Sequence, residues 1–558
     1  MFYMNKQEYD IVVVGSGAGG MTAALTAAHR GLSVVVIEKA AKFGGSTARS
    51  GGGVWVPNNE VLERDGVDDT PEAARDYLHA IIGDVVSKER IDTYLERGPE
   101  MLSFVLKNSP LKMQWVPGYS DYYPEAPGGR VGGRSVEPTP FDSTCLGTEI
   151  DNLEPDYGKA PLNVVITQAD YRAINLLRRH PSGLARVMRV GMRWMGAKLT
   201  GKHLLGRGQA LSAGLRAGLL DANVPVLLET PMTDFHVEDG RVVGVVVAGS
   251  GSVIRAKLGV VLASGGFEHN AEMREKYQRQ PIGTEWTVGA AANTGDGITA
   301  GQKLGAAVDL MDDAWWGPSI PLTGGPWFCI AERTLPGGIM VNTAGKRFLN
   351  EAAPYVEAVH MMYGGEYGIG EGPGENIPTW MIIDQRYRDR YIFAGLTPKK
   401  RFPSRWLESG VVVKADTVAE LAEKTGMPVE QLTATVERFN GFARSGVDED
   451  FRRGDSGYDK YYGDKTNKPN PSLGVIDKPP YYAVKMVPGD LGTKGGLVTD
   501  ADARVLREDG SVIDGLYAIG NASAPVMGHT YAGPGATIGP AMTFGYLAVL
   551  DMASRASQ

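Results

Sequence analysis

Short, uninterrupted runs of apolar residues flank an alanine-rich segment near the start of the chain. Tyr9 to Val14 and Leu32 to Glu38 are rich in valine, which is typical of parallel strands buried on both faces. Between them, Gly20 to Arg30 has the composition of a helix that ends at Gly31. The pattern therefore predicts one strand–helix–strand unit of about thirty residues.

Further apolar runs predict strands at Pro225 to Glu229, Val242 to Val247, Gly259 to Ala263 and, very late in the chain, Leu516 to Ile519. The position of the last run indicates that the C-terminal segment completes the sheet that the N-terminus begins. The predicted fold is α/β: a Rossmann-like domain formed by residues 1–313, with an insertion near 145–210, and by residues 487–558.

The middle of the chain, residues 314–486, is expected to form an inserted α+β domain. Its pattern mixes strands and helices, with Gly345 in a hairpin turn and a Gly/Pro-rich loop from Gly364 to Pro378. A chain of 558 residues is long enough for several domain-sized units.

Residues 181–205 combine basic and apolar side chains. The basic ones are Arg186, Arg189, Arg193, Lys198 and Lys202, and the apolar ones include Val187, Val190, Trp194 and Leu199. Two interpretations stay open: a basic amphipathic helix in contact with a membrane surface, or a surface insertion that packs on its own protein.

Composition excludes several classes of protein. The net charge of −8 favours solubility and gives no reason to expect nucleic-acid binding. Two cysteines, Cys145 and Cys329, are too few for a disulfide framework and lack metal-ligand spacing, so no metal site is expected. The first ten residues lack the apolar core of a signal peptide, and no run of 18 apolar residues occurs. A cytoplasmic location is expected, with membrane association left open.

The turn after the first strand, from Gly15 to Gly20, has the spacing GxGxxG. Gly15 permits a tight turn, Gly17 allows the backbone to approach a pyrophosphate, and Gly20 allows the helix to pack closely on the strand. The helix N-terminus then faces the phosphates, and Glu38, at the end of the second strand, can bind ribose hydroxyls. Together these features predict dinucleotide binding.

A glycine-rich stretch, Lys39 to Gly53, follows the acidic strand end. With Leu262 to Gly266, Thr294 to Gly297 and Gly515 to Asn521, it resembles the FAD site of the fumarate reductase/succinate dehydrogenase flavoprotein superfamily. The resemblance implies an FAD-binding domain with an inserted catalytic, or capping, domain. Because Lys39 to Gly53 contains no histidine, non-covalent FAD is expected.

The residues expected to contact FAD are Gly15, Ser16, Gly17, Ala18, Gly19, Gly20, Glu38, Lys39, Gly45, Ser46, Thr47, Ser50, Gly51, Gly52, Ala263, Ser264, Gly265, Gly295, Asp296, Gly520, Asn521, Ala536 and Ile538.

The substrate is expected to be uncharged. Fumarate reductases hold a dicarboxylate with His and Arg residues, but the matching segments here, Pro488 to Gly496 and Ala536 to Ala541, contain neither. Thr530 to Pro540, Gly118 to Tyr122 and Asn350 to Tyr355 instead resemble motifs of the 3-ketosteroid Δ1-dehydrogenases. That resemblance covers nearly the whole chain; the segment from about 145 to 210 is the least similar.

The resemblance implies that Tyr531 and Gly535 bind the steroid C3 carbonyl, and that Tyr119 and Tyr355 lie near the flavin. A phenol and a backbone N–H can polarise the ketone, so that the C2 proton becomes acidic. Tyr355 is the candidate base, with Tyr119 hydrogen-bonded nearby, and FAD accepts hydride from C1. The resemblance also implies a quinone as electron acceptor.

Two nearby polar residues are interpreted as non-catalytic: His529 as a packing residue and Lys494 as solvated or structural. Three alternatives remain: a 3-ketosteroid Δ4-(5α)-dehydrogenase, a fumarate-reductase-like enoate reductase, and a non-catalytic flavin-binding scaffold.

Overall fold

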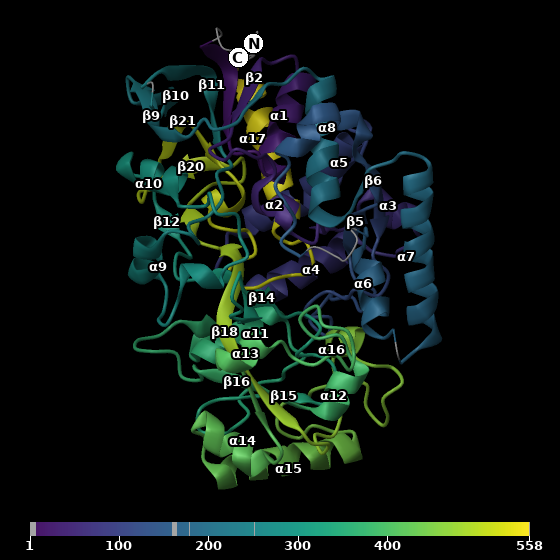
Figure 1. Cartoon of the computed structure of the whole chain (residues 1–558). Helices are drawn as coiled ribbons and strands as arrows, with labels where there is room; N and C mark the ends of the chain where they lie inside the picture. The colour runs from purple at the N-terminus through teal and green to yellow at the C-terminus, as the bar shows by residue number, and fades with distance from the viewer. Residues whose placement is uncertain (1–6, 159–163, 178, 250, 557–558) are drawn as a thin grey trace.

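The computed structural model describes residues 7–158, 164–177, 179–249 and 251–556. Its main sheet lies at the end of the molecule that carries both termini (Figure 1). Five strands of this sheet are parallel, in the order β21–β11–β1–β2–β8. Their bounds are β1 Glu8–Val14, β2 Val34–Ile37, β8 Val226–Leu227, β11 Val253–Leu262 and β21 Val512–Ala518.

The C-terminal segment does complete the N-terminal sheet, as the sequence predicts. β21 pairs in parallel with β11, and helix α17 (Ile538–Ala556) packs against α1 (Ala18–His29). Antiparallel strands β9 (Met232–Glu238), β10 (Arg241–Val247) and β20 (Arg504–Leu506) extend the sheet.

Two predicted strands differ in length from the observed ones. The strand expected from Pro225 to Glu229 has only the two residues of β8, since Glu229 adopts a φ of 51°, which an extended strand does not allow. The strand expected from Gly259 to Ala263 is the buried end of β11, whose first part has mostly half-exposed side chains and pairs with β10.

Residues 314–486 form a second layer around an antiparallel sheet of six strands, in agreement with the α+β prediction (lower part of Figure 1). The strands are β13 Ala314–Ile320, β14 Trp327–Phe328, β15 Gly338–Val341, β16 Thr379–Asp384, β17 Val412–Ala415 and β18 Tyr481–Thr493. The helices are α11 Tyr355–Tyr363, α12 Gln385–Arg390, α13 Ser404–Glu408, α14 Val418–Thr425, α15 Val429–Ser445 and α16 Gly457–Tyr462.

Strand β18 is continuous across the boundary expected between residues 486 and 487. Its first half pairs with β16 and β17, and its second half pairs with β13. The division into domains therefore stays a prediction. Gly345 lies in a tight turn, as expected, with a φ of 73° and a bond from the Asn342 N–H to the Lys346 carbonyl.

The remaining elements outside the expected insertion vary in length. They are α2 Gly45–Arg49, β3 Val54–Trp55, α3 Glu60–Arg64, α4 Pro71–Ile82, α5 Lys88–Lys107, β4 Met113–Trp115, β5 Ser135–Pro138, α8 Arg207–Asp221, α9 Ala271–Tyr277, η3 Thr284–Trp286, α10 Asp296–Lys303, β12 Val308–Asp309, η4 Glu366–Gly368, β19 Gly496–Leu497 and η5 Gly520–Ala522.

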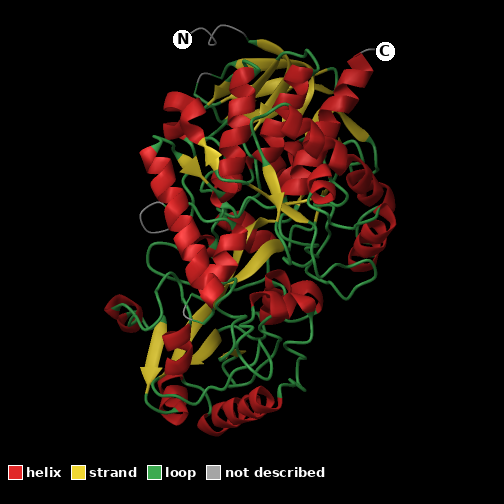
Figure 2. Ribbon diagram, turned by 90° about the vertical axis from the view of Figure 1, so that its right-hand side faces the viewer, coloured by secondary structure: helices red, strands yellow, loops and turns green. Residues whose placement is uncertain are grey.

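The expected insertion leaves and rejoins the fold at one place, where β6 (Phe141–Asp142) pairs with β7 (Leu204–Leu205). Between them lie η1 (Ser143–Asn152), α6 (Gln168–Asn175) and α7 (Pro181–Leu199). Helix α7 runs along the right-hand edge in Figure 1, the side that faces the viewer in Figure 2. No helix in the described part of the chain is long and apolar enough to span a bilayer.

Candidate functional site

A cavity of about 1450 Å³ lies between the parallel sheet and the second layer. The glycine turn after β1 lines one part of it, and Tyr119, Tyr355 and Tyr531 line another. Sites for one small molecule usually measure about 300–1,000 Å³, so this cavity has room for a dinucleotide and a second ligand.

The glycine turn has the geometry that a pyrophosphate requires. Gly15 has a φ of 108°, and a Cβ there would lie 2.3 Å from the Ala263 carbonyl oxygen. A Cβ at Gly20 would lie 2.1 Å from the Gly15 carbonyl oxygen, so the helix packs closely on the strand. A Cβ at Gly17 would meet only the Thr47 hydroxyl, at 3.6 Å. Helix α1 begins at the next residue, Ala18, with its positive end toward the cavity. These residues fit FAD.

Glu38, which the sequence predicts to bind ribose hydroxyls, lines the cavity. It also holds the glycine turn after β1 in place. Its Oε2 accepts hydrogen bonds from the Ser16 N–H (3.0 Å) and the Ser16 hydroxyl (2.6 Å). Its Oε1 accepts one from the Ala40 N–H (2.9 Å). The carboxylate thus ties the end of β2 to the glycine turn, and ribose binding stays a prediction.

Most residues expected to contact FAD line this cavity. They are Gly15, Ser16, Gly17, Ala18, Gly19, Gly20, Glu38, Lys39, Gly45, Ser46, Thr47, Ser50, Gly51, Gly52, Ala263, Ser264, Gly265, Asp296, Gly520, Asn521 and Ile538. Two expected residues do not line it. Gly295 faces Met273 and Phe267, where a Cβ would lie 2.5 Å from the Met273 sulfur, and Ala536 is buried in the turn closed by its N–H bond to Gly533.

Tyr531 and Gly535 lie together on the wall of the cavity. Tyr531 is buried, and burial raises the pKa of its phenol, while the Tyr355 hydroxyl and the Gly535 backbone act in the opposite direction. Gly535 has a φ of 98°, and a Cβ there would lie 2.4 Å from the Gly53 carbonyl carbon. Only glycine fits this position, which brings a backbone N–H close to the Tyr531 hydroxyl.

Tyr355 makes a different contact from the expected one. Its hydroxyl is 2.9 Å from the Tyr122 hydroxyl, whereas the Tyr119 hydroxyl is bonded to Tyr462 at 2.7 Å. The expected pairing of Tyr119 with Tyr355 is therefore wrong. Tyr122 takes this place because its N–H donates to the Ala532 carbonyl, so its ring stacks on Tyr531 with centroids 5.1 Å apart.

The site contains further tyrosines that the sequence analysis does not single out, although the sequence carries signals for them. Tyr122 ends the motif that begins at Gly118, three residues after Tyr119. Tyr458, Tyr461 and Tyr462 lie on α16 with the three- and four-residue spacing of one helix face. All three pack against Tyr119 or Tyr122.

The tyrosine cluster, formed by Tyr119, Tyr122, Tyr355, Tyr458, Tyr461, Tyr462 and Tyr531, is almost closed to water. Burial raises the pKa of Tyr355 well above its ordinary value, although the bond from Tyr122 acts against that rise. Burial likewise raises the pKa of Tyr122 and of Tyr119. Tyr355 is the first residue of α11, where the positive end of the helix dipole favours a negative phenolate.

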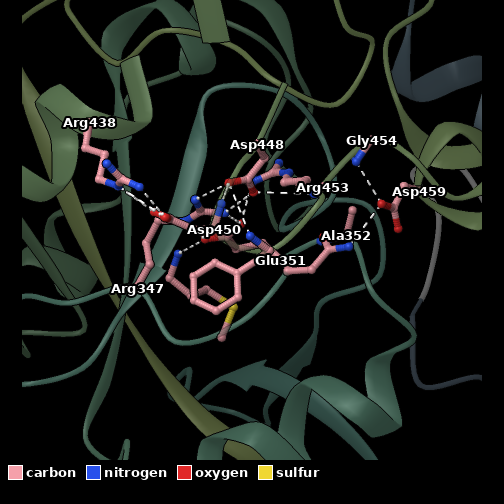
Figure 3. Close-up of polar contacts among 12 residues, drawn as sticks. Arg347, Glu351, Ala352, Arg438, Asp448, Asp450, Arg453, Gly454 and Asp459 are labelled. Atoms are coloured by element: carbon pink, nitrogen blue, oxygen red, sulfur yellow. Dashed lines mark hydrogen bonds and ion pairs between the residues drawn. The ribbon is translucent and has the colours of Figure 1, made fainter. Parts of the chain in front are cut away.

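A buried ion network behind Tyr355, drawn in Figure 3, holds the segment that leads into α11. The Glu351 carboxylate pairs with Arg347 and Arg453, each at 2.9 Å, and Arg347 also pairs with Asp448 at 2.8 Å. Arg333 donates to the carbonyls of Glu351 (2.7 Å) and Ala353 (2.6 Å). Burial raises the pKa of Glu351, but the two arginines hold it below its ordinary value.

Replacing Glu351 by glutamine is expected to destabilise the fold by about 3–5 kcal/mol, because the buried Arg453 loses its carboxylate partner and Arg347 keeps only its pair with Asp448. Equilibrium denaturation of the protein measures the change. Arg438→Gln is the matched control, since it breaks the exposed pair with Asp450 in the same region (Figure 3). Equal midpoints for both variants would contradict the role assigned to Glu351.

A second buried ion network lies beside Tyr531. Asp313 pairs with Lys494 (3.0 Å), His529 (3.0 Å) and His360 (3.1 Å). Burial raises the pKa of Asp313, but these groups hold it far below its ordinary value. Lys494 is fully buried, so the solvated interpretation is wrong, and the structural one stays a prediction.

Lys494 of this network contacts Trp315, which lines the cavity. The Lys494 ammonium lies 5.0 Å from the Trp315 ring centroid, and that ring packs edge-on against Tyr531. The Trp315 indole N–H donates to Asn521 at 3.0 Å. This network therefore supports the wall of the cavity, and its His529, bonded to Asp313, does not itself line the cavity.

Comparison with known proteins gives a consistent result. The FAD binding domain family matches residues 10–538. The 3-oxosteroid 1-dehydrogenases of Mycolicibacterium smegmatis and Mycobacterium tuberculosis are both 68% identical to this chain; the alignments cover all of this chain and 99% and 100% of those proteins. A crystal structure of 3-ketosteroid Δ1-dehydrogenase from Sterolibacterium denitrificans, in complex with 1,4-androstadiene-3,17-dione, is 41% identical, with a TM-score of 0.93 over 99% of this chain and 100% of that one.

Proposed function

Because this chain belongs to the FAD binding domain family and, within it, to the 3-oxosteroid 1-dehydrogenases, we propose a specific division of roles among its tyrosines. The enzyme is an FAD-dependent oxidoreductase that removes hydrogen from C1 and C2 of a 3-ketosteroid. A 4-ene-3-ketosteroid becomes a 1,4-diene-3-ketosteroid. This function accounts for the sequence and the cavity without the three alternatives, which are a Δ4-(5α)-dehydrogenase, an enoate reductase and a non-catalytic scaffold.

In this proposal, the Tyr531 hydroxyl and the Gly535 N–H donate hydrogen bonds to the C3 ketone oxygen. Both groups lie together on the wall of the cavity, and both can strengthen their bonds as charge develops on that oxygen. The polarised ketone makes the C2 proton acidic. The convergence of Tyr531, Gly535 and Tyr355 beside the glycine-lined part of the cavity is the observation that carries this proposal.

Tyr355, in its phenolate form, then takes the C2 proton and becomes a neutral phenol. Before this transfer, the Tyr122 hydroxyl donates to the Tyr355 oxygen, and the N-terminus of α11 stabilises the negative charge of the phenolate. FAD, when bound, supplies the acceptor for the C1 hydride. The walls of the cavity hold C1 in position and exclude water, which strengthens each of these electrostatic contacts.

Incubation with androst-4-ene-3,17-dione and an artificial acceptor tests the reaction. The expected product is the 1,4-diene, identified by mass and ultraviolet absorbance. If the enzyme instead removed hydrogen only from C4 and C5 of a 5α-reduced 3-ketosteroid, its activity would be that of a Δ4-(5α)-dehydrogenase.

FAD is proposed to be non-covalent because no histidine occurs from Lys39 to Gly53. Acid denaturation is therefore expected to release the flavin.

We propose that α7 binds an anionic membrane surface. Its outer face carries exposed apolar side chains at helical spacing: Leu184 (54%), Met188 (56%), Met192 (62%), Met195 (53%) and Leu199 (88%). The inner face is held to the protein by Arg186 and Arg193, which pair with Asp170. Arg189, Lys198 and Lys202 are exposed, and their charge complements anionic headgroups. A lipid-soluble quinone is the proposed electron acceptor.

Replacing Met188 and Met192 by glutamate is expected to lower the fraction of enzyme that sediments with phosphatidylglycerol vesicles several-fold, because the change removes apolar area and adds repulsion. Steroid turnover in detergent-free buffer should stay normal. Met361→Glu, which alters a methionine 48% exposed on α11, is the control and should sediment like the wild type. Unchanged sedimentation of the double variant would rule out this surface.

A further inference from the structure

Glu268 is a buried acid that the proposed reaction does not use. Its side chain is fully buried, and its Oε1 accepts a hydrogen bond from the Asn293 amide at 2.7 Å. Arg274, whose charge acts on Glu268, pairs instead with Asp490 at 2.6 Å. Within the described residues, no lysine, arginine or histidine forms an ion pair with the Glu268 carboxyl group. A carboxylate at this position therefore carries a charge without a direct counter-ion.

The Glu268 carboxyl group changes its charge near neutral pH. Burial raises its pKa to about 7, and the charge of Asp490 on β18 acts in the same direction. The bond from Asn293 and the charge of Arg274 on α9 oppose this rise. The adjacent His269 is bonded to a backbone carbonyl at 3.3 Å, and burial lowers the pKa of its ring. Glu268 is thus neutral below about pH 7 and negative above it.

The carboxyl group packs directly on glycines that follow cavity-lining residues. A Cβ at Gly266 would lie 2.9 Å from the Glu268 Oε2, and a Cβ at Gly492 would lie 3.3 Å from its Oε1. The preceding residues, Gly265 and Leu491, both line the cavity. Glu268 therefore lies close behind the cavity wall, where it can act on a bound molecule through its charge and not by direct contact.

The hydrogen bond from Asn293 connects Glu268 with the FAD site. The Asn293 amide nitrogen also donates to the Ser46 hydroxyl at 3.0 Å, and that hydroxyl accepts the Ala290 N–H at 2.9 Å. Asn293, Ser46 and Ala290 all line the cavity, and Ser46 is among the residues expected to contact FAD. The carboxyl group is therefore one amide away from a side chain of the FAD site.

The same carboxyl group lies near the residues that support Tyr531. A Cβ at Gly492 would lie 2.7 Å from the Asn521 Nδ2, so the Glu268 and Asn521 side chains meet at this glycine. The Asn521 oxygen accepts the Trp315 indole N–H at 3.0 Å, and the Trp315 ring packs against Tyr531. Hydride transfer requires the flavin to lie beside a steroid whose ketone is bound at Tyr531. Glu268 is thus on the side of the cavity where that transfer would occur.

A second, smaller cavity brings solvent close to Glu268. It measures about 350 Å³, and His269 and Gly289 are among its wall residues. A Cβ at Gly289 would lie 2.3 Å from the Glu268 Oε1. Gly324 and Gly325, which also line this cavity, are exposed. A proton from the solvent can therefore approach the carboxyl group to within one residue.

We propose that Glu268 sets the reduction potential of FAD and couples it to pH. The negative charge of the carboxylate opposes the addition of negative charge to the flavin, so the flavin is harder to reduce. Reduction in turn favours protonation of Glu268: the flavin gains a hydride with two electrons from the steroid, and the carboxylate takes one proton from the solvent. The inference rests on the proposed function, which places the hydride acceptor beside the steroid bound at Tyr531.

The test is the midpoint potential of the bound flavin in the wild type and in Glu268→Gln, measured by spectroelectrochemistry without steroid. Well above pH 7, the variant should have the higher potential, because it lacks the negative charge. Well below pH 7, the two potentials should coincide, because the wild-type carboxyl group is neutral. The control is Asp384→Asn, which alters an equally buried acid on β16 in the second layer and should match the wild type throughout.

Equal potentials at every pH, or a shift of the same size at every pH, would overturn the proposal, since a purely structural role does not follow the charge of one carboxyl group. Infrared difference spectra of the wild type need no variant. Above pH 7, reduction should produce the band of a protonated carboxyl group, and its absence would also overturn the proposal. The proposed function is tested separately, by formation of the 1,4-diene, and stands or falls independently of these results.

Discussion

Replacing Tyr531 by phenylalanine is expected to lower kcat about 100- to 1,000-fold while FAD stays bound, the loss that follows removal of one oxyanion-hole donor. The phenol is one of two proposed donors to the C3 ketone. The ring itself packs against Tyr122, Tyr355 and Trp315, so a phenylalanine should keep the fold. Stopped-flow reduction of the bound flavin by steroid measures the chemical step directly.

The second donor cannot be removed by substitution, since any side chain at Gly535 would collide with Gly53. A matched control is Tyr363→Phe, because Tyr363 is equally buried, donates to the Pro281 carbonyl (3.0 Å) and does not line the cavity. Its flavin reduction should be normal. A wild-type rate in Tyr531→Phe would remove the phenol from the mechanism.

Replacing Tyr355 by phenylalanine is expected to reduce kcat about 100- to 10,000-fold, because the variant lacks the proposed base. In the wild type, burial keeps this phenol protonated at neutral pH. The reactive, deprotonated form therefore becomes more abundant as pH rises, and kcat/KM should rise with pH until the phenol has titrated. The Tyr355 variant should lose this alkaline rise.

Tyr122→Phe gives a graded version of the same test. In the wild type, the Tyr122 hydroxyl lowers the pKa of Tyr355. The other groups that act on the Tyr355 phenol are Tyr531, Tyr119 and Tyr458. Loss of that bond should move the alkaline rise to higher pH, with a smaller drop in kcat than Tyr355→Phe. Tyr119→Phe should move it less, since Tyr119 is bonded to Tyr462. A larger shift for Tyr119 would restore the pairing expected from the sequence.

The parts of the site predicted from sequence are those fixed by local backbone geometry. Gly15, Gly17 and Gly20 predict the turn because each position has its own steric reason for glycine. The C-terminal completion of the sheet followed from one apolar run, since a buried strand must pair within the same sheet.

The contacts that the sequence did not reveal depend on side-chain direction in loops. Tyr119 and Tyr122 share one motif, yet it is Tyr122, held by its N–H bond to the Ala532 carbonyl, that meets Tyr355, while Tyr119 bonds Tyr462. Glu332 and Arg333 are adjacent charged residues in the sequence, yet both are buried and make separate contacts. Burial of this kind arises from tertiary packing, which no local pattern records.

A crystal structure of the flavin-loaded enzyme with a bound 4-ene-3-ketosteroid tests the central claim most directly. The ketone oxygen is expected within hydrogen-bond distance of both the Tyr531 hydroxyl and the Gly535 N–H, with C2 facing the Tyr355 oxygen. A steroid bound with its C3 ketone far from both the Tyr531 hydroxyl and the Gly535 N–H would contradict the mechanism.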